Sequence, residues 1–176
     1  MTSPLPIQNL LVVGEAGSGK TTSLRRLADL LAQRGQAPAG FTTRTIVEGG
    51  RCVGYAAHSH NGLDRRILAH EGLVSAHRWG RVGIDVDMVD YVVDTQMSRA
   101  ATLLIVDEIS PLLCMFKRFG TRLAEHLDGP TTVIASIAVP TAQGMERWLG
   151  WPNVETVELR QNTRTQIPAE LLERLS

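Results

Sequence analysis

The residues from Gly14 to Thr21 read Gly-Glu-Ala-Gly-Ser-Gly-Lys-Thr, a spacing typical of a loop that binds phosphate. Its glycines let the backbone turn inward, so that successive N–H groups point at one phosphate from a helix N-terminus. In such a loop Lys20 reaches the β- and γ-phosphates of a nucleotide, and the Thr21 hydroxyl binds Mg²⁺. The predicted nucleotide-binding residues are Gly14, Glu15, Ala16, Gly17, Ser18, Gly19, Lys20, Thr21 and Thr22.

Two acidic residues follow the apolar run 103–106. Asp107 stands at the carboxyl end of this predicted strand, where a carboxylate can hold the Mg²⁺ of a bound nucleotide. We expect it on a strand neighbouring the phosphate-binding loop, at the same edge of the sheet. Glu108 is then placed to orient a water molecule and polarise it for attack on the γ-phosphate. The alternative for Glu108 is a solvated or helix-capping acid ahead of Pro111.

The elements that position these groups are predicted from apolar runs, helical periodicity and turn residues. Strands are expected at 10–13, 41–47, 51–58, 63–68, 82–86, 102–106, 131–138 and 154–159. Helices are expected at 20–34, from a cap at Asp87 to Met97, and at 111–127, 141–149 and 167–175. The dipeptides Gly49-Gly50 and Asn61-Gly62 predict hairpin turns. Strands and helices alternate elsewhere, which predicts an α/β fold with a mostly parallel sheet flanked by helices and an antiparallel hairpin insertion.

Length and charge narrow the class of protein. The 176 residues suit one domain, residues 1–176, and 18 basic side chains balance 18 acidic ones. This balance gives no strong signal for nucleic acid or an anionic membrane. The two cysteines, Cys52 and Cys114, lack the spacing of a zinc site or a disulfide framework, and no apolar stretch is long enough for a membrane span. We therefore expect a soluble, cytoplasmic protein.

The order of motifs resembles a small P-loop nucleoside-triphosphatase family found in thermophiles, which also includes a cancer-related nucleoside-triphosphatase. The motifs that carry the resemblance are 14–21, Gly-Phe-Thr-Thr-Arg at 40–44, 49–55, 81–83, Asp-Glu-Ile-Ser-Pro at 107–111 and Asn-Thr-Arg at 162–164. Family members usually have glycine where Ser110 stands, and Arg directly after Asn162, where Thr163 intervenes. The resemblance implies a RecA-like P-loop NTPase core and slow, Mg²⁺-dependent hydrolysis of several nucleoside triphosphates. It also implies that the acid after the metal-binding aspartate acts on water.

An arginine could supply further positive charge at the γ-phosphate. The resemblance favours Arg44, so that the candidate catalytic residues are Glu108, Lys20 and Arg44, and the alternates are Arg147, Arg160 and Arg164. Two other functions stay open: a nucleotide or polynucleotide kinase, which would hand the γ-phosphate to a hydroxyl, and a nucleotide-dependent switch. A homo-oligomer or a protein partner is compatible with each. Trp79, Trp148 and Trp151 are predicted to pack in a core or against a partner, with base stacking as the alternative.

Overall fold

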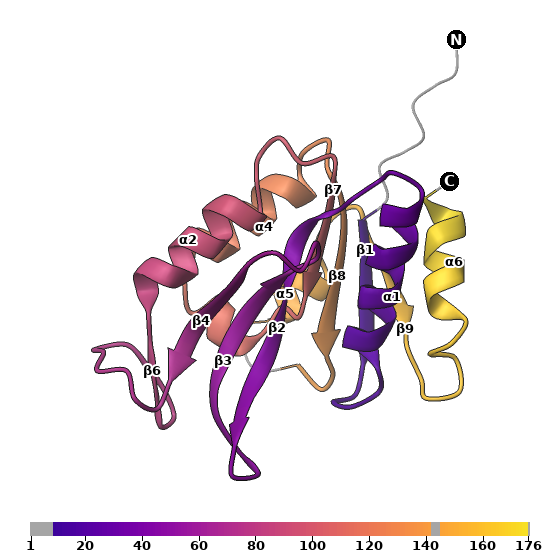
Figure 1. Cartoon of the computed structure of the whole chain (residues 1–176). Coiled ribbons are helices and arrows are strands. Elements are labelled where there is room, and N and C mark those ends of the chain that lie inside the picture. Colours follow the sequence, from indigo (N-terminus) through magenta and orange to yellow (C-terminus); the bar gives the residue numbers. More distant parts are fainter. Residues whose placement is uncertain (1–8, 142–144, 176) are drawn as a thin grey trace.

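The computed structural model describes residues 9–141 and 145–175. Its strands form a nine-stranded sheet in the order β5-β6-β4-β3-β2-β7-β8-β1-β9 (Figure 1). The strands are β1 Asn9–Gly14, β2 Ala39–Glu48, β3 Arg51–Ser59, β4 Arg65–His70, β5 Arg78–Trp79, β6 Val82–Ile84, β7 Leu103–Asp107, β8 Thr132–Ala138 and β9 Val154–Glu158. The helices are α1 Lys20–Gln33, α2 Val86–Gln96, α3 Pro111–Cys114, α4 Lys117–Leu127, α5 Glu146–Leu149 and α6 Ile167–Arg174.

The strands from β2 to β9 in this order pair in parallel and form the half of the sheet that carries the predicted site. The central strands β7, β8 and β1 are buried on both faces. On β1, Leu10 and Val12 belong to one hydrophobic core and Leu11 to the other. A strand buried on both faces reads as a continuous apolar run, which is how the sequence predicted it.

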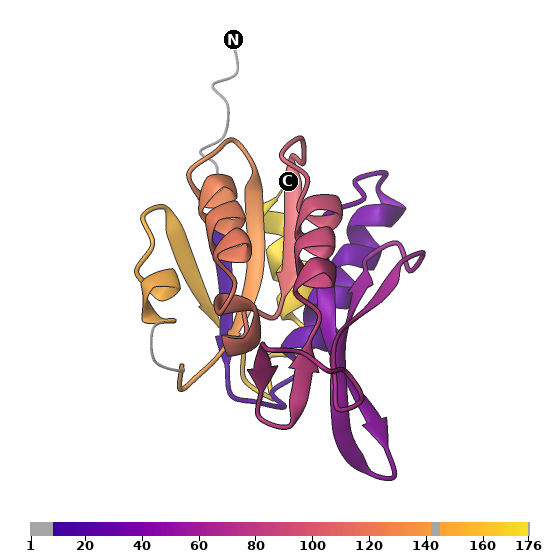
Figure 2. The same cartoon turned by 90° about the vertical axis from the view of Figure 1, so that its left-hand side faces the viewer.

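Helices cover the two faces of the parallel half. α1 and α6 lie on one face and enclose a core that includes Leu24, Leu27 and Leu171 (Figure 1). α2 and α4 lie side by side on the other face, where Val92 and Phe119 are buried (Figure 2). Within the described ranges, no helix is both long and apolar enough to cross a bilayer. The predicted α/β architecture is confirmed.

The predicted hairpin insertion is confirmed and is larger than expected. β2 and β3 pair antiparallel around Gly49-Gly50, and β3 and β4 pair antiparallel around the turn that holds Asn61-Gly62. A further hairpin of β5 and β6 continues the sheet. β6 falls within the strand expected at 82–86, whereas β5, with two residues, is too short to be predicted from alternation. Where β2 meets β7, Gly40 has φ 108°, and a Cβ there would lie 1.9 Å from the Ile105 carbonyl oxygen.

Several element boundaries differ from those expected. The cap of α2 is Asp85 and not Asp87, because the Asp85 carboxylate accepts a hydrogen bond from the Met88 N–H at 2.9 Å. The helix expected at 111–127 is broken, since Phe116 has an extended backbone that caps α4 while its ring is buried. Leu63 lies in a turn, 88% exposed, and β4 starts only at Arg65. Part of the helix expected at 141–149 falls outside the described residues, and α5 covers its last four.

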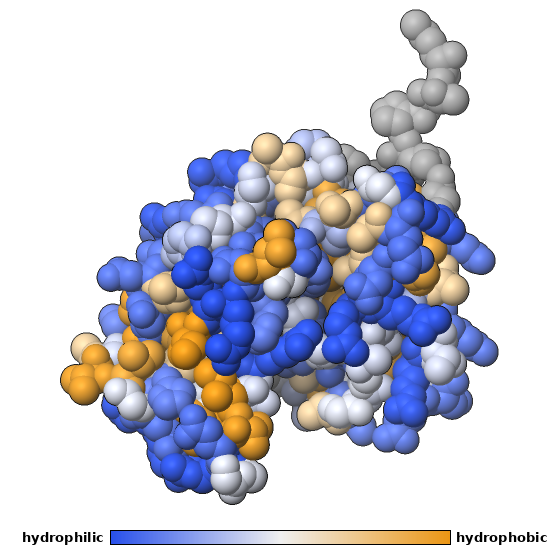
Figure 3. Space-filling model, in the orientation of Figure 1, coloured by the Kyte–Doolittle hydropathy of each residue, from blue (hydrophilic) through white to orange (hydrophobic). Residues whose placement is uncertain are grey.

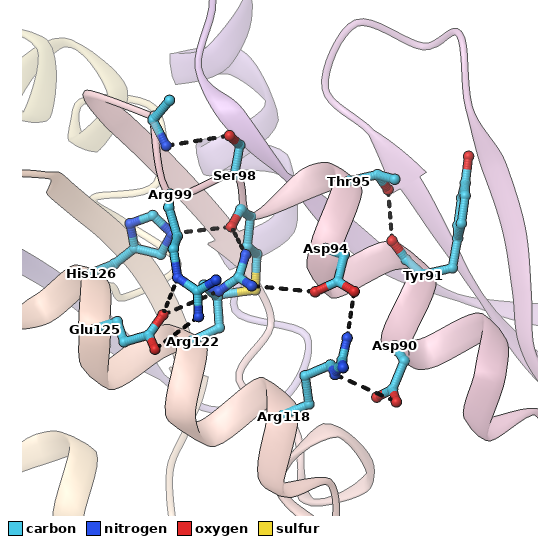
Figure 4. A network of polar contacts seen from close by, with 12 residues as sticks. Asp90, Tyr91, Asp94, Thr95, Ser98, Arg99, Arg118, Arg122, Glu125 and His126 are labelled. Atoms are coloured by element: carbon cyan, nitrogen blue, oxygen red, sulfur yellow. Dashed lines mark hydrogen bonds and ion pairs between the residues drawn. The ribbon is translucent and has the colours of Figure 1, made fainter.

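Ion pairs join α2 to α4 on the outer surface of these helices (Figure 4). Arg118 pairs with Asp90 and Asp94. Arg122 pairs with Asp94 at 3.2 Å and with Glu125 at 3.3 Å. These contacts lie over the helix pair, away from the sheet edge where the phosphate-binding loop begins.

Candidate functional site

The phosphate-binding loop connects the end of β1 at Gly14 to the start of α1 at Lys20. Gly17 and Gly19 have φ values of 77° and 102°, a left-handed conformation that glycine adopts without a Cβ penalty. At Gly14 a Cβ would lie 2.7 Å from both the Leu159 carbonyl oxygen and the Ser18 hydroxyl. The glycine spacing is thus required by the backbone path, as the sequence pattern indicated.

Lys20 is folded back into the loop. Its side chain is 4% exposed, and its ammonium group donates hydrogen bonds to the carbonyl oxygens of Gly14 at 3.1 Å and Glu15 at 2.9 Å. The ammonium nitrogen also lies 3.7 Å from Glu108 Oε2. The structure therefore brings together Lys20, at the start of α1, and Glu108, directly after β7, two of the three predicted catalytic residues.

Asp107 ends β7 and is fully buried. The expectation that its strand neighbours the loop strand is wrong, because β8 lies between β7 and β1. All three strands run parallel, so their carboxyl ends still meet at one edge. The Ser136 hydroxyl on β8 donates a hydrogen bond to Asp107 Oδ1, whereas Oδ2 has no hydrogen-bond partner within the described part of the chain. A buried carboxylate oxygen without a donor fits a metal cation.

Ser136 is a site residue that the sequence analysis missed. It is fully buried in the middle of an otherwise apolar strand, where a hydroxyl needs a partner. The polar residue inside the run Val-Ile-Ala-Ser-Ile-Ala was the available signal. Its hydrogen-bond partner, Asp107, could not be predicted without the strand order, because β7 and β8 are separated in sequence and become neighbours only in the folded sheet.

Glu108 is partly buried, with its side chain 32% exposed. Burial raises the pKa of its carboxyl group above the ordinary value, and the negative charge of Asp107 raises it further. The positive charge of Lys20 acts in the opposite direction and lowers the pKa. A carboxyl group with a raised pKa is a stronger proton acceptor once ionised, which is the property that a general base needs.

Two hollows flank the first turn of α1. One, of about 300 Å³, is lined by Gly19, Thr22, Ser23, Arg26, Arg164, Thr165 and Pro168. The other, of about 270 Å³, is lined by Thr21, Thr43, Thr45, Tyr55, Trp79, Glu108, Ser110, Pro111 and Leu112. Only the second contains the predicted base Glu108 and the predicted metal ligand Thr21. Both hollows therefore adjoin the end of the loop at which α1 begins.

The arginines considered as sources of positive charge at the γ-phosphate differ in their distance from the phosphate-binding loop. Arg44 is exposed and lies between Thr43 and Thr45, so strand alternation puts it on the face of β2 opposite to the second hollow. Its charge helps to lower the pKa of His58, after burial as the main cause. Arg164 is the alternate that reaches the loop, since a Cβ at Gly19 would lie 3.5 Å from its Cδ.

The other two alternates are engaged elsewhere. Arg147 stacks on the ring of Trp148, with its guanidinium carbon 4.3 Å from the ring centroid. Arg160 forms an ion pair with Glu158 at 2.9 Å. Trp148 is buried and stacks on Trp151, which confirms core packing for both residues. Trp79 instead lines the second hollow and is 40% exposed.

The sequence of this chain is similar to those of known nucleoside-triphosphatases. The family model described as NTPase matches residues 9–172. The nucleoside-triphosphatase THEP1 of Thermotoga maritima is 28% identical over 166 residues, which cover 93% of this chain and 92% of that protein. The nucleoside-triphosphatase THEP1 of Methanopyrus kandleri is 30% identical over 128 residues, which cover 72% of this chain and 71% of that protein.

Two solved structures share the fold. The crystal structure of THEP1 from the hyperthermophile Aquifex aeolicus matches with a TM-score of 0.80 and 22% identity, over 96% of this chain and 99% of that one. The solution structure of a human cancer-related nucleoside triphosphatase matches with a TM-score of 0.80 and 20% identity, over 96% of this chain and 97% of that one. Since the family model spans all but the ends of the sequence, the chain belongs to the nucleoside-triphosphatase family.

Proposed function

We propose that this protein hydrolyses nucleoside 5'-triphosphates, among them ATP and GTP, to the diphosphate and phosphate in a Mg²⁺-dependent reaction. The observation that carries the proposal is the convergence of Lys20, Asp107 and Glu108 at one sheet edge. Lys20 lies 3.7 Å from Glu108, so a γ-phosphate bound by the ammonium group would lie within reach of the base. We also propose that residues 1–176 act as one domain, because the described strands form a single sheet.

Mg²⁺ would be held by the Thr21 hydroxyl and by Asp107, whose Oδ2 is buried without a hydrogen-bond donor in the described structure. When bound, the ion neutralises negative charge on the β- and γ-phosphate oxygens. Ser136 keeps the carboxylate in one orientation through its hydrogen bond to Oδ1. The loop amides from Gly14 to Thr22 would surround the phosphates at the N-terminus of α1.

Glu108 would accept a proton from the attacking water. Its carboxylate faces the hollow that also contains Thr21, so a water there lies between the base and the metal ligand. Lys20 would exchange its hydrogen bonds to the Gly14 and Glu15 carbonyl oxygens for bonds to phosphate oxygens. The charge of Lys20 also favours the ionised form of Glu108, which is the form that can take up a proton.

The nucleoside would lie in the hollow beside Gly19 and Thr22. Arg164 lines this hollow, and its guanidinium plane can stack on any base. Arg26 lines it as well, and the described lining residues include no Asn, Gln, Asp or Glu that could read the edge of adenine or cytosine. This lining supports a triphosphatase that accepts several bases.

The test is phosphate release from ATP, GTP, CTP and UTP by the wild type and two variants. Glu108→Gln should keep nucleotide affinity and lose about 10²-fold or more of turnover, because it removes the proton acceptor. Lys20→Ala should impair binding and turnover together. Matched controls are Glu173→Gln, at an exposed position of α6, and Lys117→Ala, at the exposed start of α4. Full turnover in Glu108→Gln would overturn the assignment of the base.

A further inference from the structure

The 270 Å³ hollow beside Glu108 extends well beyond the predicted path of the phosphates. Its far side is made by Tyr55 on β3 and Trp79 on β5, which belong to the antiparallel part of the sheet. One water in liquid occupies about 30 Å³, so the hollow is much larger than the attacking water requires. The hollow proposed for the nucleoside is a separate one, beside Gly19 and Thr22. Space for a second molecule is therefore present at the γ-phosphate end.

The charge of this hollow restricts what that molecule can be. Among the described residues that line it, Glu108 is the charged one, and no arginine or lysine contributes. Asp107 adds a second negative charge close to Glu108, and the positive charge of Lys20, 3.7 Å from Glu108, is the one assigned to the triphosphate. Arg44 lies on the opposite face of β2 and does not line the hollow. A molecule that carries its own phosphate would find no cationic side chain in these walls, which argues against the nucleotide and polynucleotide acceptors considered from the sequence.

The walls favour a flat ring with hydroxyl groups. Tyr55 and Trp79 offer aromatic faces, and Trp79 is 40% exposed without a ring partner in the described structure. Thr43 Oγ1 is buried and has no hydrogen-bond partner within the described residues, although it lies in the wall of the hollow. A buried hydroxyl without a partner is unfavourable, and a bound hydroxyl compound would satisfy it.

We infer that this hollow binds an uncharged, ring-bearing alcohol of the nucleoside type and that the protein transfers the γ-phosphate to it. The inference rests on the proposed function, since it uses the same nucleotide site and the same base. The acceptor oxygen forms a bond to the γ-phosphorus as the bond from that phosphorus to the β–γ bridging oxygen breaks. The bridging oxygen leaves with its electron pair as part of the nucleoside diphosphate. The hydroxyl proton passes to the Glu108 carboxylate and then to solvent, so the products are a phosphate monoester, a diphosphate and one proton.

The experiment supplies ATP labelled in its γ-phosphate together with adenosine, guanosine, cytidine or uridine. Both labelled free phosphate and labelled nucleoside monophosphate are measured. AMP serves as the charged acceptor control. We expect labelled monophosphate from at least one nucleoside, and at least tenfold less transfer to AMP than to that nucleoside. Glu108→Gln should lower both products about 10²-fold or more, because water and nucleoside use the same base.

Substitutions of residues that line the hollow distinguish loss of acceptor binding from loss of folding. Trp79→Ala and Thr43→Val should each lower the ratio of transfer to hydrolysis at least tenfold, and Trp79→Phe should restore part of that loss. Tyr91→Ala removes an aromatic ring of similar exposure, 42%, from α2 and should leave the ratio unchanged. Thermal unfolding of each variant verifies that it is folded.

The outcomes distinguish the two proposals. Release of phosphate without labelling of any of the four nucleosides would overturn the acceptor site and leave the triphosphatase proposal standing. Transfer to AMP equal to transfer to nucleosides, or a ratio unaffected by Trp79→Ala, would also overturn it. Absence of both products in the wild type would overturn the proposed function itself.

Discussion

The Ser136 hydroxyl on β8 donates a hydrogen bond to Asp107 Oδ1 at the end of β7, so one carboxylate oxygen is committed inside the sheet. The other oxygen, Oδ2, has no partner in the described structure. This division of roles suits a metal ligand, because outer hydrogen bonds orient the group that binds the ion. It also turns a residue with no direct contact to the nucleotide into a determinant of Mg²⁺ affinity.

Ser136→Ala should therefore raise the Mg²⁺ concentration that gives half-maximal hydrolysis by about tenfold or more, while saturating Mg²⁺ restores much of the rate. The measurement is a Mg²⁺ titration of phosphate release at fixed ATP. Ser98→Ala, at an exposed position after α2, is the matched control. An unchanged Mg²⁺ requirement would show that Asp107 needs no support from β8.

The pH dependence should reflect Glu108, whose pKa is raised chiefly by burial. The group acts as a base only when ionised, so kcat/KM should fall as the pH is lowered through this raised pKa. The acid limb should thus lie at higher pH than the ordinary glutamate value of about 4.3. Glu173→Gln should keep this limb, whereas the residual activity of Glu108→Gln should lack it. A limb at or below the ordinary value would contradict the buried environment of Glu108.

Arg164, beside the loop, and Arg44, on the face of β2 opposite to the hollow with Glu108, should differ in kinetics. Arg164→Ala should raise the KM for all four triphosphates, because Arg164 lines the hollow proposed for the nucleoside. If Arg44 supplies charge to the transition state, Arg44→Ala should lower kcat about tenfold or more with little change in KM. Steady-state kinetics of both variants test this contrast. An unchanged kcat in Arg44→Ala would remove Arg44 from the mechanism.

Gly40 should be nearly irreplaceable for stability. A Cβ at this position would lie 1.9 Å from the Ile105 carbonyl oxygen, and its φ of 108° is unfavourable for any side chain. Gly40→Ala should lower the free energy of unfolding by about 3 kcal/mol or more. Gly35→Ala is the control for φ alone, because Gly35 has φ 76° with open space around it. It should cost about 1–2 kcal/mol, as measured by denaturant unfolding.

Two neighbouring arginines on α4 should contribute unequally to stability (Figure 4). Arg122 has a side chain 9% exposed and donates a hydrogen bond to the Met97 carbonyl oxygen at 2.6 Å, in addition to its ion pairs. Arg122→Ala should lower the free energy of unfolding by about 2–4 kcal/mol, because it removes the packing of a largely buried side chain together with a charged hydrogen bond to the Met97 carbonyl oxygen. The Arg118 side chain is 48% exposed and pairs with Asp90 and Asp94. Arg118→Ala should therefore cost below about 1 kcal/mol. Equal losses in urea unfolding would contradict this assignment.

The sequence was sufficient for the phosphate-binding loop because its geometry is local. Gly17 and Gly19 adopt left-handed conformations within a few residues of Lys20, so spacing alone encodes the turn. The parallel strands were predicted for a similar reason, since burial on both faces leaves a continuous apolar run. The break at Phe116 was not predicted, because apolar residues on both sides of it continue a helical pattern while the backbone extends.

The rest of the candidate site depends on contacts between distant segments. Ser136 meets Asp107 only because β8 pairs with β7, and no local pattern determines strand order. Trp79 reaches the hollow beside Glu108 on β5, a strand too short to recognise from alternation. Arg44 was favoured by the family resemblance, but which face of β2 it occupies follows from the position of Thr43 and Thr45 in the wall of the hollow.

The placement of β8 between β1 and β7 gives a bound nucleotide a mechanical role. Phosphates bound at the end of β1 and a metal ion bound by Asp107 would link β1 to β7 across β8, the strand between them. Ligand that binds only the folded state stabilises it, and here the gain would be concentrated in a strand that offers the nucleotide no side chain of its own. Backbone amides of β8 should therefore exchange with deuterium more slowly once nucleotide and Mg²⁺ are added.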